Sequence, residues 1–432
     1  MLYSIVRPVA ALALQINYKR IFLSHADRIP KNKPVILAAN HPTAFIEPCV
    51  LACFLDRPLY FLVRGDIFKK SFYAKILADL HMIPVYRMKD GGYEKIKNNF
   101  ESFDHCFRAL ASDKTLMILA EGSTQQEKRL QSLKKGAARI AFGAFDKYPD
   151  LPDLYIVPTG VNYTYPNQVR SEIMIRFGEP IPVRLYLEDY QTNPNKAISK
   201  LTDDLRDRML ESVISIDRPQ DEQLTEYLLV ICRSERTDPL LPPVNRRATG
   251  RFECEKRIVD WVNVMPEEEK KALEQSTQAY FQEISQYGLS DRALRRYSPG
   301  RHFLLGAGLI LGLPVWAVGT LATWPPLALA RYVVNNKVRH IEFFEPVRIV
   351  IALVSSLIWS LLLLAAGGLL AGWNGVAIAA LCVTAGYFAI WYRSWAAGWR
   401  ESEAYRRTPP IVRRRLAKQR QEIIRQMPNK CG

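Results

Sequence analysis

Two long runs of uncharged, apolar residues limit what this chain can fold into more than any other feature. The first covers residues 303–330 and the second covers residues 349–392, which makes 28 and 44 residues without a charge. A helix that spans a membrane needs about 20 such residues. Soluble domains rarely contain two runs of this length, so we expect part of the chain to lie in a lipid bilayer.

The second run contains a turn signal near its middle, the sequence GWNG at residues 372–375. This signal divides the run into two spans of about 20 residues, which predicts a helical hairpin. Basic residues flank both of its ends and place those ends on the cytoplasmic side. The first run also has basic residues on both sides, and Pro314 and the pair Pro325-Pro326 divide it. We therefore expect a re-entrant or interfacial pair of short helices at residues 303–330, with a simple span as the alternative.

The charge balance is basic, with 59 Lys and Arg against 43 Asp and Glu. Residues 396–432 hold ten basic and three acidic residues of the chain, whose net charge is +16. A basic segment after an apolar span is typical of contact with anionic lipid headgroups, so we expect membrane phospholipids and no nucleic acid as partners. The cysteines and histidines lack the spacing of metal ligands, and no metal site is predicted.

Short apolar runs alternate with helix-like stretches from about residue 18 to residue 190, which predicts an α/β domain. The expected strands lie at residues 34–39, 59–64, 115–120, 154–163 and 172–178, and the expected helices at residues 93–111 and 134–147. The rest of the chain divides into an interfacial helix at residues 1–17, a helical region at 191–300, a membrane domain at 301–395 and a basic cytoplasmic tail at 396–432.

His41 follows the first expected strand, in the sequence NHPTAFIEP, and Glu47 comes six residues later. Ligands of α/β sheets bind at strand ends, and a helix that begins near Phe45 would hold the Glu47 carboxylate against the imidazole. A carboxylate on Nδ1 fixes the tautomer whose Nε2 acts as a base, and it stabilises the imidazolium ion. Taken alone, the spacing favours a solvated or hydrogen-bonded loop histidine over a catalytic one.

Three further segments close apolar runs with turns. MIPVYR ends at Arg87, ILAEGSTQQ contains Glu121, Gly122 and Ser123, and IVPTGVNY contains Val157 and Pro158. Because each of them closes an expected strand, they can meet His41 at one edge of the sheet. Together they favour the catalytic interpretation of His41.

In this order, the motifs NHxxxxxE, IPVYR, EGS with LKKGAARIA, and IVPTGVNY resemble the glycerophospholipid acyltransferase superfamily. The glycerol-3-phosphate/dihydroxyacetone-phosphate acyltransferase branch is the most similar one. The resemblance is clear over residues 34–190 and looser to about residue 395. It implies an α/β acyltransferase domain with a mixed sheet flanked by helices, a helical insert and C-terminal transmembrane helices. It also implies that His41 is the general base and that Glu47 orients it.

Roles in substrate binding follow from the same resemblance. The implied residues are Asn40, Arg87, Glu121, Gly122 and Ser123 around the acceptor, with Val157 and Pro158 shaping an acyl pocket. A guanidinium offers a planar fork to phosphate, and a glycine lets backbone N–H groups approach an anion. Glu121 has the wrong charge for phosphate, so we expect it to organise the loop or to bind glycerol hydroxyls.

The chain departs from the family pattern at three points. The acid of the catalytic pair is usually Asp, the residue before Glu-Gly is usually Pro rather than Ala120, and an Arg that often follows Gly is missing. The residues that can supply the missing positive charge are Lys128, Arg129, Lys134 and Lys135.

The implied function is that of a membrane-bound O-acyltransferase in phospholipid biosynthesis. It would transfer a fatty acyl group from acyl-CoA or acyl carrier protein (acyl-ACP) to glycerol 3-phosphate or lysophosphatidic acid, with the catalytic domain facing the cytoplasm. A thioester is already activated, so we expect no cofactor beyond that co-substrate. Two alternatives stay open: another acceptor, such as a lyso-ornithine lipid or a lipid A precursor, and a catalytically weak lipid-binding homologue.

Overall fold

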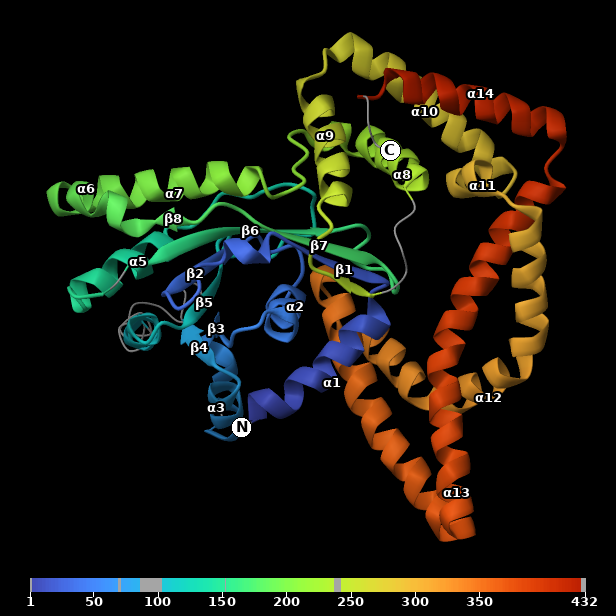
Figure 1. Cartoon of the computed structure of the whole chain (residues 1–432), viewed down its shortest axis with the longest axis horizontal. Coiled ribbons are helices and arrows are strands. Elements are labelled where there is room, and N and C mark those ends of the chain that lie inside the picture. Colours follow the sequence, from blue (N-terminus) through green and yellow to red (C-terminus); the bar gives the residue numbers. More distant parts are fainter. Residues whose placement is uncertain (1, 69–70, 86–102, 152, 237–241, 429–432) are drawn as a thin grey trace. The chain divides into compact units, whose positions relative to one another are not determined.

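The chain forms two compact units in a computed structural model that describes residues 2–68, 71–85, 103–151, 153–236 and 242–428 (Figure 1). Unit 1 consists of Met1–Ser215, Leu240–Phe252 and His340–Pro346, and unit 2 consists of Ile216–Pro239, Glu253–Arg339 and Val347–Gly432. Each unit is therefore built from segments that are far apart in the sequence.

Unit 1 contains one mixed sheet. Its strands are β1 (Arg20–Ser24), β2 (Val35–Ala39), β3 (Leu59–Arg64), β4 (Met82–Val85), β5 (Thr115–Leu119), β6 (Tyr155–Tyr163), β7 (Glu172–Phe177), β8 (Ile181–Pro182) and β9 (Val244–Asn245). The order is β4-β3-β5-β2-β6-β7-β1-β9, with β8 beside β6. Strand β6 runs antiparallel to β7 and β8, whereas the other pairs are parallel. The prediction of a mixed α/β sheet is confirmed.

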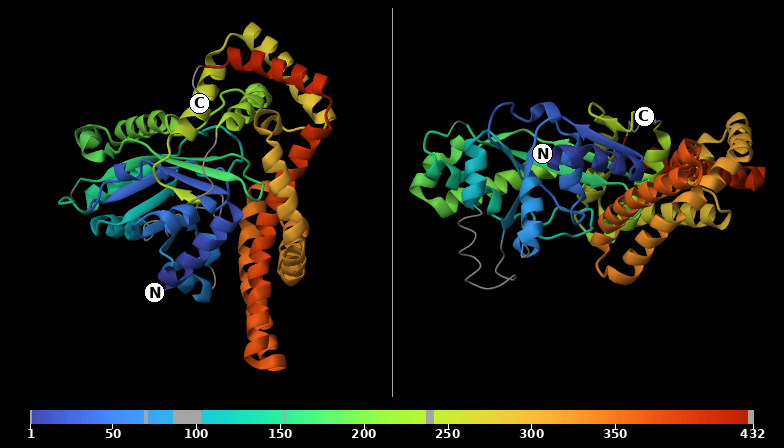
Figure 2. Two further views of the ribbon diagram at one scale, coloured as in Figure 1. Left: turned by 45° about the vertical axis from the view of Figure 1, so that its right-hand side comes forward. Right: turned by 90° about the horizontal axis from the view of Figure 1, so that it is seen from below.

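The central strand β2 is buried along its whole length, because helices cover both faces of the sheet (Figures 1 and 2). The helices of unit 1 are α1 (Leu2–Asn17), α2 (Ile46–Phe54), α3 (Ser71–Asp79), α5 (Gly136–Lys147), α6 (Leu187–Thr192) and α7 (Pro194–Leu210). Ile36 and Ala38 of β2 pack in a core with α5 and α7. A strand covered on both faces reads as a continuous apolar run, which is why β2 was predictable.

The five expected strands are confirmed to within one residue at each end, and the expected helix at 134–147 is α5. Residues 103–111 are helical, and the rest of the helix expected at 93–111 lies outside the described residues. The boundary expected at residue 190 is wrong, since unit 1 continues through α7 to Ser215. The reason is that Ala197, Leu201 and Leu205 of α7 are buried in the sheet core.

Gly160 of β6 allows the loop after α7 to lie directly on the sheet. A Cβ atom at this position would be 1.8 Å from the backbone oxygen of Ser212. The Asn162 side chain holds the same loop, because its amide donates to Ser212 O at 3.1 Å and its oxygen accepts from Ile214 N at 2.7 Å. The close approach of the loop therefore depends on the missing side chain of Gly160.

A Gly160→Ala substitution is expected to lower the midpoint of thermal unfolding by roughly 3–10 °C, because overpacking costs about 1–3 kcal/mol. Gly136→Ala is the matched control, since a Cβ there meets nothing within 4 Å and alanine favours a helix. Fluorescence-monitored melting of both variants tests this. Equal midpoints for the two variants would contradict the packing described for the loop.

Two late segments of the chain complete unit 1. Strand β9 pairs with β1 and forms that edge of the sheet. The Asn17 amide donates to Glu345 Oε1 at 2.7 Å, and both side chains are buried. The backbone N–H of Ala44 donates to Glu342 O at 3.2 Å. The loop that follows β2 is thus tied to residues that directly precede the second apolar run.

Unit 2 is helical in its described residues apart from loops. Its helices are α8 (Glu222–Glu235), α9 (Gly250–Val264), α10 (Glu267–Gln286), α11 (Asp291–Arg296), α12 (Pro299–Lys337), α13 (Phe344–Arg407) and α14 (Pro410–Gln426). By length and composition, two helical segments are candidate membrane spans, Pro299–Lys337 and Ile341–Arg407. Helix α13 is interrupted at Ala371 and at Gly372, which has φ +56°. The break coincides with the turn signal at residues 372–375, where Gly372 supplies the left-handed conformation. A hairpin of two membrane spans stays a prediction.

The expectation of two separate short helices at residues 303–330 is wrong. Helix α12 is continuous from Pro299 to Lys337 and contains Pro314, Pro325 and Pro326. Each proline removes only one backbone donor, and a long helix accommodates this loss by bending. Figure 1 shows the α12 ribbon bending along its course.

Small residues let α12 and the two arms of α13 approach closely. An added Cβ at Gly319 would be 2.1 Å from Ala385 O, and one at Gly367 would be 2.4 Å from Gly375 O. The Trp359 indole donates to Ala322 O at 2.8 Å. Close backbone contact through small residues is typical of helix packing in membranes.

The basic segment at residues 396–432 differs from the expected tail. Helix α13 continues to Arg407, and α14 packs on α10. Arg415 pairs with Glu283, and the buried Arg420 pairs with Asp291 at 2.8 Å. The cause is an apolar stripe on α14, which buries Val412, Leu416 and Ile423. Several of the charges expected to meet lipid headgroups are therefore neutralised within unit 2.

Candidate active site

The carboxyl ends of the parallel strands β2 and β5 meet beside the longer strand β6. Ala39, the last residue of β2, pairs with Leu119 of β5 and with Thr159 of β6. Asn40 and His41 follow β2 directly, and Glu121 lies two residues beyond the end of β5. The topology thus brings the predicted site residues of these segments to the same edge, as expected of ligand sites in α/β sheets.

His41 and Glu47 face each other across the turn between β2 and α2. The distance from His41 Nδ1 to Glu47 Oε2 is 3.6 Å. The Glu47 side chain is fully buried in the first turn of α2, where the positive end of the helix dipole favours an anion. The six-residue spacing therefore does what the sequence predicts and places the carboxylate beside the imidazole.

The other oxygen of Glu47 is fixed by the loop itself. Glu47 Oε1 accepts hydrogen bonds from Thr43 N at 2.6 Å and from Thr43 Oγ1 at 2.8 Å. Among the described residues, His41 Nδ1 and Glu47 Oε2 are buried and have no hydrogen-bond partner. A catalytic hydrogen bond is often long before substrate binds and shortens afterwards. The pair is thus positioned to leave His41 Nε2 for a substrate hydroxyl.

Glu121 holds the backbone of the catalytic loop. Its Oε2 accepts from His41 N at 2.7 Å, and its Oε1 accepts from Gln131 N at 2.9 Å. Burial raises the pKa of this carboxyl, while its two backbone donors act in the opposite direction. Of the two roles that the sequence left open for Glu121, organising the loop is the one that these bonds support.

A Glu121→Gln substitution is expected to lower kcat about tenfold, because an amide offers one acceptor to two backbone donors and an unmade buried hydrogen bond costs about 1–3 kcal/mol. KM for the acceptor should change little. Glu127→Gln is the control, since Glu127 is exposed and makes only a 3.8 Å ion pair with Arg129. Steady-state kinetics of both variants test this, and equal kcat values would contradict the positioning role.

Asn40 is bound to strand β6 on both sides of its amide. Its Nδ2 donates to Val161 O at 2.9 Å, and its Oδ1 accepts from Val161 N at 2.7 Å. This pair of bonds extends the β2–β6 ladder by one side chain. Asn40 therefore fixes the position of the backbone directly before His41. A direct contact of the Asn40 amide with substrate would break these two hydrogen bonds.

Val157 and Pro158 lie within the sheet, opposite Leu37 and Ala38 of β2. Both are buried. They lie below the strand end that carries His41, and their role in an acyl pocket stays a prediction.

Gly122 and Ser123 form the turn after β5. Gly122 has φ +70°, and its N–H donates to Leu119 O at 3.1 Å. That N–H is therefore already used and is not available to an anion. Ser123 is exposed. Arg87, the residue expected to bind phosphate, lies outside the described residues.

Among the four basic residues near the EGS motif, Lys134 lies closest to the Gly122 turn. A Cβ at Gly122 would be 2.9 Å from Lys134 Cγ, and Lys134 N donates to Ala120 O at 2.8 Å. Lys135 instead reaches Ser199, at 2.7 Å. Lys134 is thus the best placed of the four to supply the charge that the missing Arg would carry.

Sequence reasoning missed Thr43 and Tyr163. Thr43 is fully buried, and its hydroxyl is 3.4 Å from the Tyr163 hydroxyl at the end of β6. Burial and the nearby Glu47 charge raise the pKa of Tyr163 well above its usual range, so the phenol is neutral. The signal for Thr43 was its position four residues before Glu47 at a helix start, which resembles a capping box.

Within the described ranges, no group of three or more His, Cys, Asp or Glu side chains could hold a metal ion. The described residues bring one imidazole, two carboxylates and a nearby ammonium group to this edge of the sheet. This arrangement suits the removal of a proton from a hydroxyl.

Comparisons with known proteins agree with the motifs. A sequence model of the family described as Acyltransferase matches residues 20–162. The chain is 24% identical over 253 residues to glycerol-3-phosphate O-acyltransferase 1 of Saccharomyces cerevisiae, covering 55% of this chain and 32% of that protein. It is 28% identical over 173 residues to glycerol-3-phosphate O-acyltransferase 2 of the same yeast, covering 38% and 23%. The chain thus spans a third or less of the length of these relatives.

Among solved structures, the 1-acyl-sn-glycerophosphate acyltransferase of Thermotoga maritima is similar, at 15% identity and a TM-score of 0.28. The match covers 42% of this chain and 72% of that one. The family match covers β1 to β5 and all of β6 except Tyr163, and it includes His41, Glu47 and Glu121. This chain therefore carries an acyltransferase-family domain at residues 20–162.

Proposed function

We propose that this protein is a membrane-bound O-acyltransferase. It transfers a fatty acyl group from acyl-CoA or acyl-ACP to a hydroxyl of glycerol 3-phosphate or of lysophosphatidic acid. The observation that carries the proposal is the buried His41–Glu47 pair, 3.6 Å apart at the carboxyl edge of the sheet. Similarity to the two yeast glycerol-3-phosphate O-acyltransferases supports the choice of acceptor.

In the proposed reaction, His41 Nε2 takes the proton of the acceptor hydroxyl while that oxygen attacks the thioester carbonyl. Glu47 holds Nδ1–H and stabilises the imidazolium ion. The carbon–sulfur bond then breaks, and the imidazolium returns the proton to the thiolate. The products are an ester and a free thiol, and His41 ends the cycle in its starting state.

In this proposal, basic residues beside the Gly122 turn supply positive charge at the acceptor site. Lys134 places an ammonium group near the turn, and Arg87 supplies a second cation if the family pattern holds. Candidate spans α12 and α13 keep the protein at the membrane, where acyl products accumulate. The catalytic unit faces the cytoplasm, because basic residues flank the spans.

An acceptor panel tests the proposal. The full-length chain in washed membranes receives radiolabelled acyl-CoA or acyl-ACP together with glycerol 3-phosphate, lysophosphatidic acid, lyso-ornithine lipid or a lipid A precursor. Radioactive phosphatidic or lysophosphatidic acid is the expected product. A labelled product from only the lyso-ornithine or lipid A acceptor would replace the proposed acceptor, and no product from any of them would contradict acyl transfer itself.

A further inference from the structure

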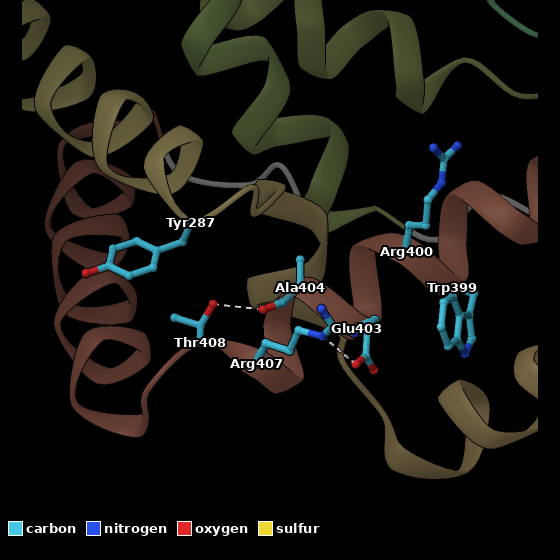
Figure 3. Close-up of a pocket in the computed structure, with 7 residues that line it drawn as sticks. All are labelled: Tyr287, Trp399, Arg400, Glu403, Ala404, Arg407 and Thr408. Carbon is cyan, nitrogen blue, oxygen red and sulfur yellow. Dashed lines mark hydrogen bonds and ion pairs between the residues drawn. The ribbon is translucent and has the colours of Figure 1, made fainter.

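A pocket separate from the candidate active site lies within unit 2, at the end of α13 that follows the apolar run (Figure 3). Its volume is about 410 Å³, and its lining is Tyr287, Trp399, Arg400, Glu403, Ala404, Arg407 and Thr408. We call it the Arg400 pocket. All of its residues belong to unit 2, and nothing in the acyl-transfer proposal uses them.

Positive charge dominates this pocket. Its one carboxylate, Glu403, pairs with Arg407 at 2.7 Å and with Arg406 at 2.8 Å. Arg400 is exposed, and among the described residues it has no hydrogen-bond or ion-pair partner. Figure 3 shows its guanidinium pointing away from the Glu403–Arg407 pair. An anion that enters the pocket would therefore meet a guanidinium with all of its donors free.

Further basic residues crowd the start of α12 nearby in unit 2. A smaller pocket is lined by Arg292, Arg296 and Arg301 together with Gly398, Glu401 and Ser402 of α13, and it shares no residue with the Arg400 pocket. Burial lowers the pKa of Arg296, and the like charges of Arg292, Arg295 and Arg301 lower it further. Glu235 acts against this repulsion and pairs with Arg295 at 3.1 Å, so this group of arginines already has a carboxylate partner.

The Arg400 pocket also lies at the level expected for lipid headgroups. The uncharged run of α13 ends at Tyr392, and only Arg393 interrupts the uncharged sequence before Arg400. At 1.5 Å per residue, Trp399 lies about 10 Å beyond Tyr392 along the helix. Tryptophan is enriched at membrane–water interfaces, and basic pockets between membrane helices bind lipid headgroups.

We propose that the Arg400 pocket binds the phosphate group of an anionic membrane lipid. The Arg400 guanidinium provides the main contact, in the forked geometry that suits phosphate oxygens. Arg407, which lines the same pocket, adds a second positive charge. The Thr408 hydroxyl already donates to Ala404 O at 2.8 Å and is not needed. The proposal requires that α12 and α13 lie in the bilayer, but it does not require acyl transfer.

Quenching of tryptophan fluorescence tests the proposal directly, since Trp399 lines the pocket. The purified full-length chain in detergent micelles is titrated with brominated phosphatidic acid, and a Trp399→Phe variant supplies the background from the other tryptophans. We expect saturable quenching in the wild-type chain and none above background in the Trp399→Phe variant. The dissociation constant should rise about fivefold in Arg400→Gln and about 25-fold in Arg400→Gln/Arg407→Gln, since each basic residue near an anionic lipid contributes a roughly fivefold factor.

Arg406→Gln is the matched control. Arg406 has the same charge as Arg407 and the same partner, Glu403, but it does not line the pocket. Equal weakening by Arg406→Gln and Arg407→Gln would overturn the proposal, because it would indicate a diffuse charge effect. Displacement of the lipid by an equal concentration of inorganic phosphate or glycerol 3-phosphate would also overturn it, in favour of a soluble ligand. Retained binding in Arg400→Lys, with loss in Arg400→Gln, would support it.

Discussion

Replacing His41 by alanine is expected to lower kcat for acyl transfer by about 10²–10⁴-fold, the usual contribution of a general base. The imidazole is the titratable group next to the buried Glu47 at the carboxyl edge of the sheet. Without it, the acceptor hydroxyl must lose its proton to water while it attacks the thioester. Initial rates with saturating acyl donor and acceptor measure the effect.

His105→Ala is the matched control for His41→Ala. His105 is exposed, and its ring lies 3.4 Å from the Arg108 guanidinium. The control should keep full activity, and both variants should reach the membrane in equal amounts. If His41→Ala kept wild-type kcat, the proposed mechanism would be wrong, although the lipid site at Arg400 would be unaffected.

Glu47→Gln is expected to lower kcat by about 10²–10⁴-fold, as when the carboxylate beside a catalytic histidine becomes an amide. Gln can still accept the hydrogen bonds from Thr43, so the turn should keep its fold. Its NH₂ group, however, can face Nδ1 and favour the tautomer that leaves no base at Nε2. The measurement is a comparison of kcat with KM, and KM for the acceptor should stay within about threefold if the amide acts through His41 alone.

Glu47→Asp separates orientation from charge. One carboxylate oxygen of Glu47 accepts a hydrogen bond from Thr43, and the other lies 3.6 Å from His41 Nδ1. A side chain one methylene shorter cannot keep both contacts, so we expect activity between that of the wild type and that of Glu47→Gln. A rate above that of the wild type would show that Glu47 supports slower acyl transfer than the Asp that is usual in the family.

The sequence alone is sufficient to predict the strands at the centre of unit 1. Strand β2 is covered on both faces, so its apolar run is unbroken, and the turn after it must place His41 at the sheet edge. Glu47 was equally predictable, because a helix start fixes its position relative to His41. The sequence does not predict β1 and β9. Strand β9 has only two residues, and β1 is held between β9 and β7, both of which are far away in the sequence.

Contacts between distant segments account for the remaining errors. No local pattern shows that Glu121 would bind His41 N, 80 residues away. The charge of the segment after residue 396 predicts a tail, but the apolar stripe on the same segment packs it against α10. The prolines of α12 predict breaks, but a helix that packs against two neighbouring arms has enough tertiary support to absorb them.

The division of unit 1 into three stretches of chain has a consequence for biosynthesis. The loop that carries His41 is completed by Glu342, and Asn17 finds its buried partner only at Glu345. Residues 303–330, an apolar run that must enter the bilayer if the protein is to be anchored, leave the ribosome before either of them. Unit 1 therefore cannot complete its fold until the first apolar run has left the ribosome, and the catalytic loop is among the last parts of the unit to gain all of its contacts.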